Sequence, residues 1–175
     1  MRRPTFLVFS GLVALGLALS ACDAGEPSTP TADVNAFTAT VVSPAGVATS
    51  LSGSALVTRD PASFQGAFYT YPTQDSSGTD LTDLLIALQA ESGEELYLMR
   101  VAPTALASGT YDIEPLFDFH PPYDFAAGYV VDGEGTGAVS GTVTLAASAE
   151  RVDGSFDLVL EDGSTLKGSF SAEAE

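Results

Sequence analysis

The alternation of apolar and polar residues in the last third of the chain is the feature that most constrains its fold. Val143 and Leu145 alternate with threonines, and Phe156, Leu158 and Leu160 lie two residues apart. Because successive side chains of a β-strand point to opposite faces, this spacing places the apolar residues together on one side. The pattern predicts strands with one face on a core and the other in water.

An Asp-Gly pair separates two of these strands. Residues 161–164 read Glu-Asp-Gly-Ser and lie between the strand-like segments 152–160 and 165–171. Glycine accepts the positive φ that tight hairpin turns require, so Asp-Gly between alternating segments is a hairpin signal. The C-terminal part is therefore expected to be an antiparallel meander.

The same texture of short β-branched and aromatic stretches between Gly, Pro, Asp and Ser clusters begins near Val34. It predicts strands over residues 36–42, 51–58, 64–71, 84–90, 95–101, 110–113, 127–131, 139–147, 152–160 and 165–171. The expected fold is all-β, a single antiparallel β-sandwich or partly closed β-barrel of about 8–10 strands.

Only residues 81–90 compete as a helix. Their apolar residues at 81, 84, 85 and 88 follow helical spacing. However, the sequence Glu-Ser-Gly-Glu follows at 91–94, and another apolar stretch follows at 96–99. This order is typical of a hairpin, which we favour over the helix.

The N-terminus has the layout of an export signal. Arg2 and Arg3 precede an apolar run that carries no charge before Asp23. A basic segment followed by an apolar one predicts a helical signal peptide. An uncleaved membrane anchor and ordinary secretory cleavage near Ala21 or Ala24 are the alternatives.

The run ends at Leu19-Ser20-Ala21-Cys22, which resembles the processing site of bacterial lipoproteins. The resemblance implies that the Cys22 thiol carries a diacylglyceryl group, that cleavage follows Ala21, and that the acyl chains hold the protein on a membrane. Residues 1–21 would be the lipoprotein signal peptide, 22–34 a flexible Pro-Ser-Thr tether and 35–175 the β-domain. The implied location is the cell envelope, with the outer membrane favoured and the periplasmic or surface face left open.

Short glycine-containing strands in the C-terminal part carry a second resemblance. The stretches Gly-Thr-Val-Thr-Leu at 141–145, Gly-Ser-Phe at 154–156 and Gly-Ser-Phe at 168–170 resemble small β-rich bacterial lipoproteins of uncharacterised function. The similarity spans roughly residues 50–172. It implies an all-β fold and an envelope location, and it brings no catalytic residues.

Charge and cysteine content exclude several classes of function. Loss of the signal peptide removes two of the six basic residues and none of the 23 acidic ones, which changes the formal net charge from −17 to −19. Such a surface repels phosphate backbones, so we expect no nucleic-acid partner. Cys22 is the only cysteine, which excludes disulfides and cysteine-based zinc sites in the β-domain.

The sole histidine, His120, lies between Asp118 and Asp124. Further acids lie nearby in the chain at Asp112, Glu114, Asp132 and Glu134. Oxygen ligands suit calcium, but this spacing lacks the ligand series of an EF-hand, and no nucleophile-elbow motif accompanies the histidine. We therefore expect no enzyme, no catalytic residue, no cofactor and no metal; a cation-binding module or a hydrolase is the disfavoured alternative.

Six of the sixteen aromatic residues fall between Tyr111 and Tyr129. They can form a lip for a ligand or cap one end of the core, and the cap is favoured. The expected function is a lipid-anchored envelope protein with a non-enzymatic structural or partner-binding β-domain. The alternative is a carrier of a small hydrophobic ligand in a lipocalin-like barrel. The membrane, through acyl chains on Cys22, is the only specified partner; protein and small-ligand partners stay open.

Overall fold

The described strands form one antiparallel sheet. The computed structural model describes residues 33–58, 77–115 and 123–173, which belong to one compact unit, Ala32–Glu175. The strands are β1 (Ala36–Val42), β2 (Ala48–Thr58), β3 (Thr82–Ala90), β4 (Glu95–Ala102), β5 (Gly109–Asp112), β6 (Tyr123–Val131), β7 (Glu134–Ala147), β8 (Arg151–Leu160) and β9 (Thr165–Glu173). Within these ranges there is no helix of the length and apolarity that a membrane span requires. The all-β, antiparallel prediction is confirmed.

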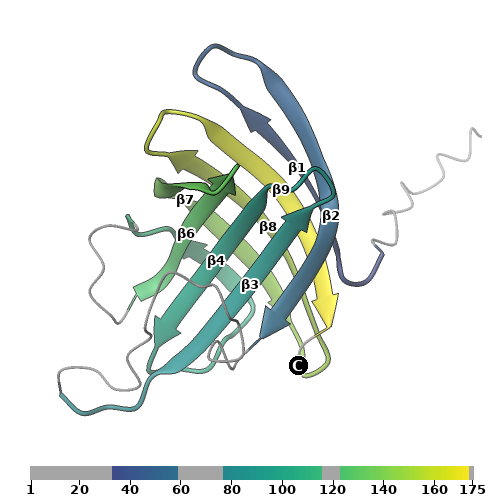
Figure 1. Cartoon of the computed structure of the whole chain (residues 1–175). Helices are drawn as coiled ribbons and strands as arrows, with labels where there is room; N and C mark the ends of the chain where they lie inside the picture. Colours follow the sequence, from purple (N-terminus) through teal and green to yellow (C-terminus); the bar gives the residue numbers. More distant parts are fainter. Residues whose placement is uncertain (1–32, 59–76, 116–122, 174–175) are drawn as a thin grey trace, which may run out of the picture. The chain divides into compact units, whose positions relative to one another are not determined.

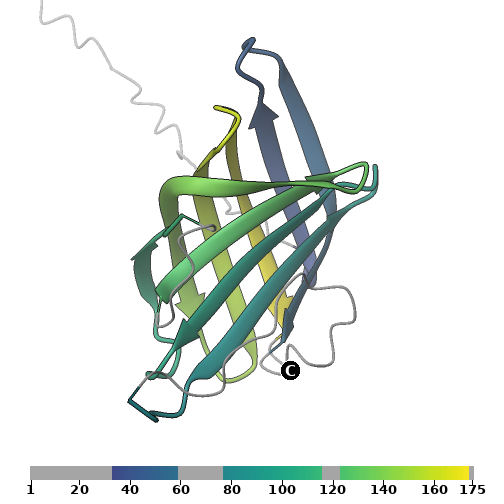
Figure 2. The same cartoon turned by 60° about the vertical axis from the view of Figure 1, so that its left-hand side comes forward.

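The sheet closes on itself. Hydrogen-bonded neighbours follow the order β5-β7-β6-β4-β3-β2-β1-β9-β8, and β8 also pairs with β7. Eight strands, all except β5, therefore make a closed ring, and Figures 1 and 2 show them wrapped around a common axis. Of the two architectures expected from the sequence, the barrel is the one that forms.

The short strand β5 lies where β6 and β7 diverge. Strand β7 pairs with β6 through Glu134–Gly137 and with β5 through Thr142–Leu145. Beyond β5, the amide of Glu114 donates to the carbonyl of Phe125 in β6 at 2.8 Å. Strand β5 therefore occupies the gap that opens between β6 and β7.

Within the segment 81–90, residues Thr82–Ala90 form strand β3, as the hairpin interpretation predicted. Strand β3 pairs with β4 in a register that places Leu88 opposite Leu96 and Ile86 opposite Leu98. The turn between them contains Gly93, which has a φ of 105°. Tertiary pairing therefore overrides the local helical spacing of the apolar residues in this segment.

Alternation decides which side chains enter the barrel. The residues that the sequence placed on one face, Leu158 and Leu160 in β8 and Val143 and Leu145 in β7, are all buried in the main core. Every other barrel strand contributes to this core in the same way, so its interior is filled with side chains from all sides. The aromatic members are Phe37, Phe125, Phe156 and Phe170.

Strands β3, β4 and β6 are buried on both faces. A second cluster, on the outer face of these strands, contains Leu85, Met99, Val101 and Ala126, each no more than 3% exposed. Leu81, just before β3, packs against it. Double burial explains why the sequences of these strands read as nearly continuous apolar runs instead of alternating ones.

The turn between β6 and β7 is tighter than the sequence suggested. Strands were expected at 127–131 and 139–147, with a connection between them, but β7 starts at Glu134. Asp132 has a φ of 52° and Gly133 a φ of 82°, so two residues with positive φ make the whole turn. This geometry matches the right-handed twist of the flanking strands. The glycines of 135–137 extend the strand through backbone pairing without an apolar pattern.

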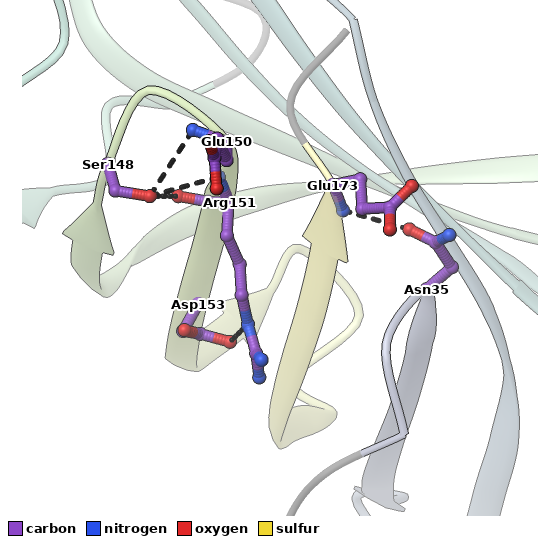
Figure 3. Close-up of polar contacts among 6 residues, drawn as sticks. All are labelled: Asn35, Ser148, Glu150, Arg151, Asp153 and Glu173. Carbon is purple, nitrogen blue, oxygen red and sulfur yellow. Dashed lines mark hydrogen bonds and ion pairs between the residues drawn. The ribbon is translucent and has the colours of Figure 1, made fainter.

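The chain enters and leaves the barrel at one end. The side-chain oxygen of Asn35, just before β1, accepts a hydrogen bond of 2.9 Å from the amide of Glu173 at the end of β9 (Figure 3). The β7–β8 turn lies at the same end, and the Ser148 hydroxyl accepts the amide of Arg151 at 3.0 Å there (Figure 3). The strand expected over 64–71 lies outside the described residues.

Candidate functional site

Arg100 is a charged side chain inside the barrel. It lies opposite Leu84 in the β3–β4 register, and its side chain is directed toward the interior together with Leu96 and Leu98 of the same strand. Only 3% of Arg100 is exposed. Burying a charge is costly unless it is paired and hydrogen-bonded, so this position needs partners that satisfy the guanidinium group.

Thr104 supplies two of these partners. The Arg100 Nη1 atom donates to the carbonyl oxygen of Thr104 at 2.8 Å, and Nη2 donates to the Thr104 hydroxyl at 3.0 Å. Two oxygens of one residue therefore engage both terminal nitrogens of the guanidinium fork. Arg100 also takes part in at least one further interaction.

The ring of Tyr111 in β5 packs against the guanidinium group of Arg100. Its ring centroid lies 5.7 Å from Cζ of Arg100, within the range of a cation–π interaction. The same ring lies 5.3 Å from the ring of Phe125, which is fully buried. Arg100 is thus held between an aromatic wall and the residue that follows β4 by two positions.

Residues 103–108, which we call the end strap, connect β4 to β5 across this end of the barrel. Besides the Thr104 contacts, the Tyr111 hydroxyl donates to the carbonyl of Ala107 at 2.7 Å. Ser108 accepts the amide of Ala147 at 2.9 Å, and Leu106 packs against the main core. Arg100, Tyr111 and β7 therefore fix the strap at separate points.

A buried guanidinium next to these groups has a limited chemical repertoire. An arginine side chain in a protein is always charged and donates hydrogen bonds without exchanging protons. The groups that the structure describes around it are a threonine, a tyrosine and apolar side chains.

A second polar pair lies on the outer wall of the barrel. The Tyr97 hydroxyl in β4 donates a short hydrogen bond to Oε2 of Glu95. Burial raises the pKa of Tyr97 far above its ordinary value, and the hydrogen bond and negative charge of Glu95 raise it further. Both residues line a small hollow of about 170 Å³, together with Leu56 of β2 and Gln89 of β3. This volume is smaller than that of pockets for drug-sized ligands, which measure about 300 Å³ or more.

Tyr129 of β6 lies at the end of the barrel opposite Arg100 and packs against the core. Burial raises the pKa of its phenol, and the negative charge of Glu94 raises it further. Phe125 belongs to the core, and Tyr111 and Tyr129 pack against it from different ends of the barrel, so the described aromatics do not gather as a cap at one end. Phe117 and Phe119 lie outside the described residues.

Exposed hydroxyl groups follow one another around the remaining outer wall. In register from β2 to β5, these positions form a row that we call the hydroxyl row: Ser52, Thr38, Ser169, Ser155, Thr144 and Thr110. Two open hollows of about 600 Å³ and 550 Å³ lie over β1 and β2, and the second extends to β9. Ser and Thr side chains make up much of their lining.

The residues singled out from the sequence do not form a common site in the part of the chain that the structure describes. Cys22, Asp118 and His120 lie outside the described residues. Asp112 is in β5 and Glu114 follows it, whereas Asp132 and Glu134 belong to the turn between β6 and β7. Asp124 is in β6. In the described ranges no three His, Cys, Asp or Glu side chains are grouped so that they could hold a metal ion.

Arg100 was not among the residues that the sequence indicated. The sequence does contain an indication of its position. Arg100 follows the apolar stretch Leu-Tyr-Leu-Met at 96–99 and lies two residues after Leu98, so it shares the face of the inward-facing leucines. This alternation alone does not decide whether the arginine side chain reaches solvent beyond the end of the strand. Among the described residues, Thr104 of the end strap and Tyr111, which come from later in the chain, contact its guanidinium group.

Comparison with known proteins gives no family assignment: no family model matches the chain, and no curated protein or solved structure is significantly similar to it.

Proposed function

We propose that the protein is a lipid-anchored component of the bacterial cell envelope whose β-barrel is a non-enzymatic module for contact with a partner. The lipobox Leu19-Ser20-Ala21-Cys22 and the polar tether support the anchor. The tether joins the barrel at the end where Asn35 binds Glu173. The anchor and the barrel are separate parts of this proposal and need separate tests.

The packing of the barrel interior is the observation that favours a partner-binding module over a carrier of a small hydrophobic ligand. The ring of Phe170 lies against Gly154, and both the ring of Phe156 and the side chain of Ala39 lie next to Gly168. These contacts lie between neighbouring strands, β8 with β9 and β9 with β1, and belong to the buried core inside the barrel. A lipocalin-like carrier needs an apolar cavity for its ligand, whereas a core packed in this way favours binding on the outer wall.

The outer wall offers a surface of defined chemistry. The hydroxyl row presents uncharged donors and acceptors, and the two hollows over β1 and β2 add the charged residues Asp33, Glu91 and Lys167 to their Ser and Thr side chains. Lys167 and Asp157 beside the row form an ion pair of 2.7 Å. A hydroxyl-rich surface is suited to hydrogen bonding with polar partners, and polyanions are disfavoured because the whole protein is strongly acidic.

The anchor is tested by metabolic labelling of cells with an alkyne fatty acid, using the wild type and Cys22→Ser. We expect label on the wild type only, and an unprocessed or released serine variant. Label that persists on Cys22→Ser would contradict the lipobox assignment. Protease shaving of intact cells then identifies the membrane face on which the barrel lies.

The module is tested against the carrier by native mass spectrometry of the purified protein. The proposal expects a mass that matches the acylated polypeptide alone. A stoichiometric small apolar molecule that is released on unfolding would instead support the carrier. The acyl chains on Cys22 serve as an internal control, because they are covalent and stay with the unfolded chain.

A further inference from the structure

Strand β2 has an unpaired edge near the tip of its hairpin with β1. Its pairing with β1 covers residues 48–54, whereas its pairing with β3 starts only at Gly53. Next to that point, the amide of Glu91 donates to the carbonyl of Ser52 at 3.0 Å. Figures 1 and 2 show the β1–β2 hairpin extending past the β3–β4 hairpin. In the part of the chain that the structure describes, β2 therefore has one free edge over residues 48–51.

The hydrogen bonds on the two sides of β2 show which backbone groups lie on this edge. The amide of Ala55 donates to the carbonyl of Asn35, just before β1, at 3.0 Å. The carbonyl of Ser52 instead accepts its bond from the β3 side. Because hydrogen-bonded residues alternate along an antiparallel ladder, odd-numbered residues of β2 bond to β1 and even-numbered residues bond to the other side. The N–H and C=O groups of Ala48 and Ser50 consequently point toward the free edge.

The sequence of this edge contains none of the features that keep strand edges from pairing with other chains. Natural proteins protect such edges with lysines, prolines, bulges or charges. Residues 48–52 read Ala-Thr-Ser-Leu-Ser, and their register with β1 is continuous. Residues 34–58 carry no charge at all, although the whole chain has a formal net charge of −17. The edge is therefore suited to pairing with another strand.

A second copy of the chain matches this edge. Two acidic molecules repel each other, and the repulsion is weakest where neither surface carries a charge. In a two-fold arrangement with Thr49 of each copy opposite the other, Ala48 of one copy lies opposite Ser50 of the second copy. Each such pair exchanges two backbone hydrogen bonds, so the free groups of one edge satisfy those of the other. This register leaves the carbonyl of Ser52 to Glu91.

The same register covers an exposed apolar side chain. Val47, at the start of this edge, is 63% exposed, more than the other exposed large apolar residues among the described ones. Because side chains alternate along a strand, Val47 lies on the same face as Thr49 and Leu51. In the two-fold register it faces Leu51 of the second copy, so pairing removes its apolar surface from water. The two Thr49 side chains form a cross-strand pair at the axis, which also stabilises the contact.

We propose that the protein forms a two-fold dimer in which the free β2 edges of two copies, residues 48–51, pair antiparallel and join the two barrels. The contact is short, so the dimer is expected to be reversible. The inference goes beyond the proposed envelope module, because it concerns association between copies of this chain. It depends neither on acylation of Cys22 nor on a different partner at the outer wall.

The test is sedimentation velocity of the full chain over a wide range of protein concentrations, in a mild detergent whose density is matched to the solvent. We expect the sedimentation coefficient to rise from that of a monomer to that of a dimer and then to stay constant, because a two-fold contact closes on itself. A monomer at every concentration up to the solubility limit would overturn the proposal. Continued growth beyond the dimer would overturn it as well.

Ser50→Pro is the decisive variant, because it removes an N–H group from the free edge without removing a hydrogen bond to β1. Each dimer loses two backbone hydrogen bonds, so the dissociation constant of the dimer should rise by about tenfold or more. Circular dichroism and urea unfolding show whether the barrel stays folded. Equal dissociation constants for the wild type and a folded Ser50→Pro variant would contradict the pairing.

Ser50→Lys keeps the backbone and protects the edge with a charge. It should weaken the dimer even though it lowers the net negative charge of each copy. Ser155→Lys is the matched control, because Ser155 is also an exposed serine but lies in β8 between two paired strands, β7 and β9. If Ser50→Pro does not fold, this comparison decides the proposal, and equal dissociation constants for the two lysine variants would overturn it.

Thr49→Cys tests the register of the two edges. Residues opposite each other in a pair without mutual hydrogen bonds have Cα atoms about 4.5 Å apart, which a disulfide can bridge. Mild oxidation should therefore convert Thr49→Cys into a covalent dimer, whereas Ser155→Cys should stay monomeric on a non-reducing gel. The wild type, which contains only Cys22, shows what that thiol contributes. A dimer that sediments as expected but does not cross-link through Thr49→Cys would overturn the proposed pairing.

Discussion

The ring of Phe170 in β9 lies against the backbone of Gly154 in β8, its direct partner in the β8–β9 register. A methyl group on Gly154 would lie 2.5 Å from two carbons of the Phe170 ring, which is closer than carbon atoms approach one another. Phe156 and Gly168 repeat the arrangement in the opposite direction on the same two strands. Each glycine thus leaves room for the aromatic ring across from it, and the two pairs fill the interior beside β1.

Gly154→Ala should destabilise the barrel. The new methyl group must displace the Phe170 ring or the Leu145 side chain, and such overpacking costs about 1–3 kcal/mol. Urea unfolding measures the loss. In a Phe170→Leu background the same substitution should cost less, because the obstructing ring is gone. Gly109→Ala is the control, since no atom lies within 4 Å of its added methyl group. Equal losses at Gly154 and Gly109 would contradict the packing.

Leu158→Ala and Val159→Ala test the alternation in β8. Leu158 is fully buried inside the barrel, whereas Val159 faces outward and is 37% exposed. Truncation of the leucine should cost about 2–5 kcal/mol through lost burial and the cavity left behind. Truncation of the valine should cost less than about 1 kcal/mol. Comparable values for the two neighbours would show that the inward and outward faces are assigned wrongly.

The phenol of Tyr97 should titrate at higher pH than an exposed tyrosine. Burial is the first cause of its raised pKa, and Glu95 adds to it, so Glu95→Gln should lower the pKa without restoring the ordinary value. Because the folded-state pKa lies above the unfolded one, this group stabilises the fold fully below about pH 10, and the contribution is lost as the pH rises above that value. NMR of ring-labelled tyrosine follows the titration; a Tyr97 signal that titrates with the exposed tyrosines would contradict it.

The ion pair between Lys167 and Asp157 should contribute little to stability. Its side chains are 66% and 52% exposed, so water screens their attraction despite the distance of 2.7 Å. A double-mutant cycle with Lys167→Met and Asp157→Asn should give a coupling below about 1 kcal/mol. The coupling should shrink further in 1 M salt. A coupling that is much larger and insensitive to salt would mean that the pair is shielded from solvent.

The strands could be predicted well because their signals are local. Period-two alternation placed β8 and β9 nearly to the residue, and the Asp162-Gly163 turn joined them as expected. Strand boundaries were predicted less accurately where a strand lacks an apolar pattern, as in the glycine-rich start of β7. For residues 81–90 the sequence pattern was compatible with both a helix and a hairpin, because a strand that is buried on both faces does not alternate apolar and polar residues.

The sequence by itself determined the all-β class, most strand positions and the inward face of each alternating strand, because these follow from the two-residue period of the backbone. Only the tertiary structure decided that the sheet closes through β7 and β8, since the alternation is the same in a sandwich and in a barrel. It also decided the environment of Arg100. Strand phase directs that side chain inward, but Thr104 and Tyr111 enclose it through contacts that arise only when β4, the end strap and β5 come together.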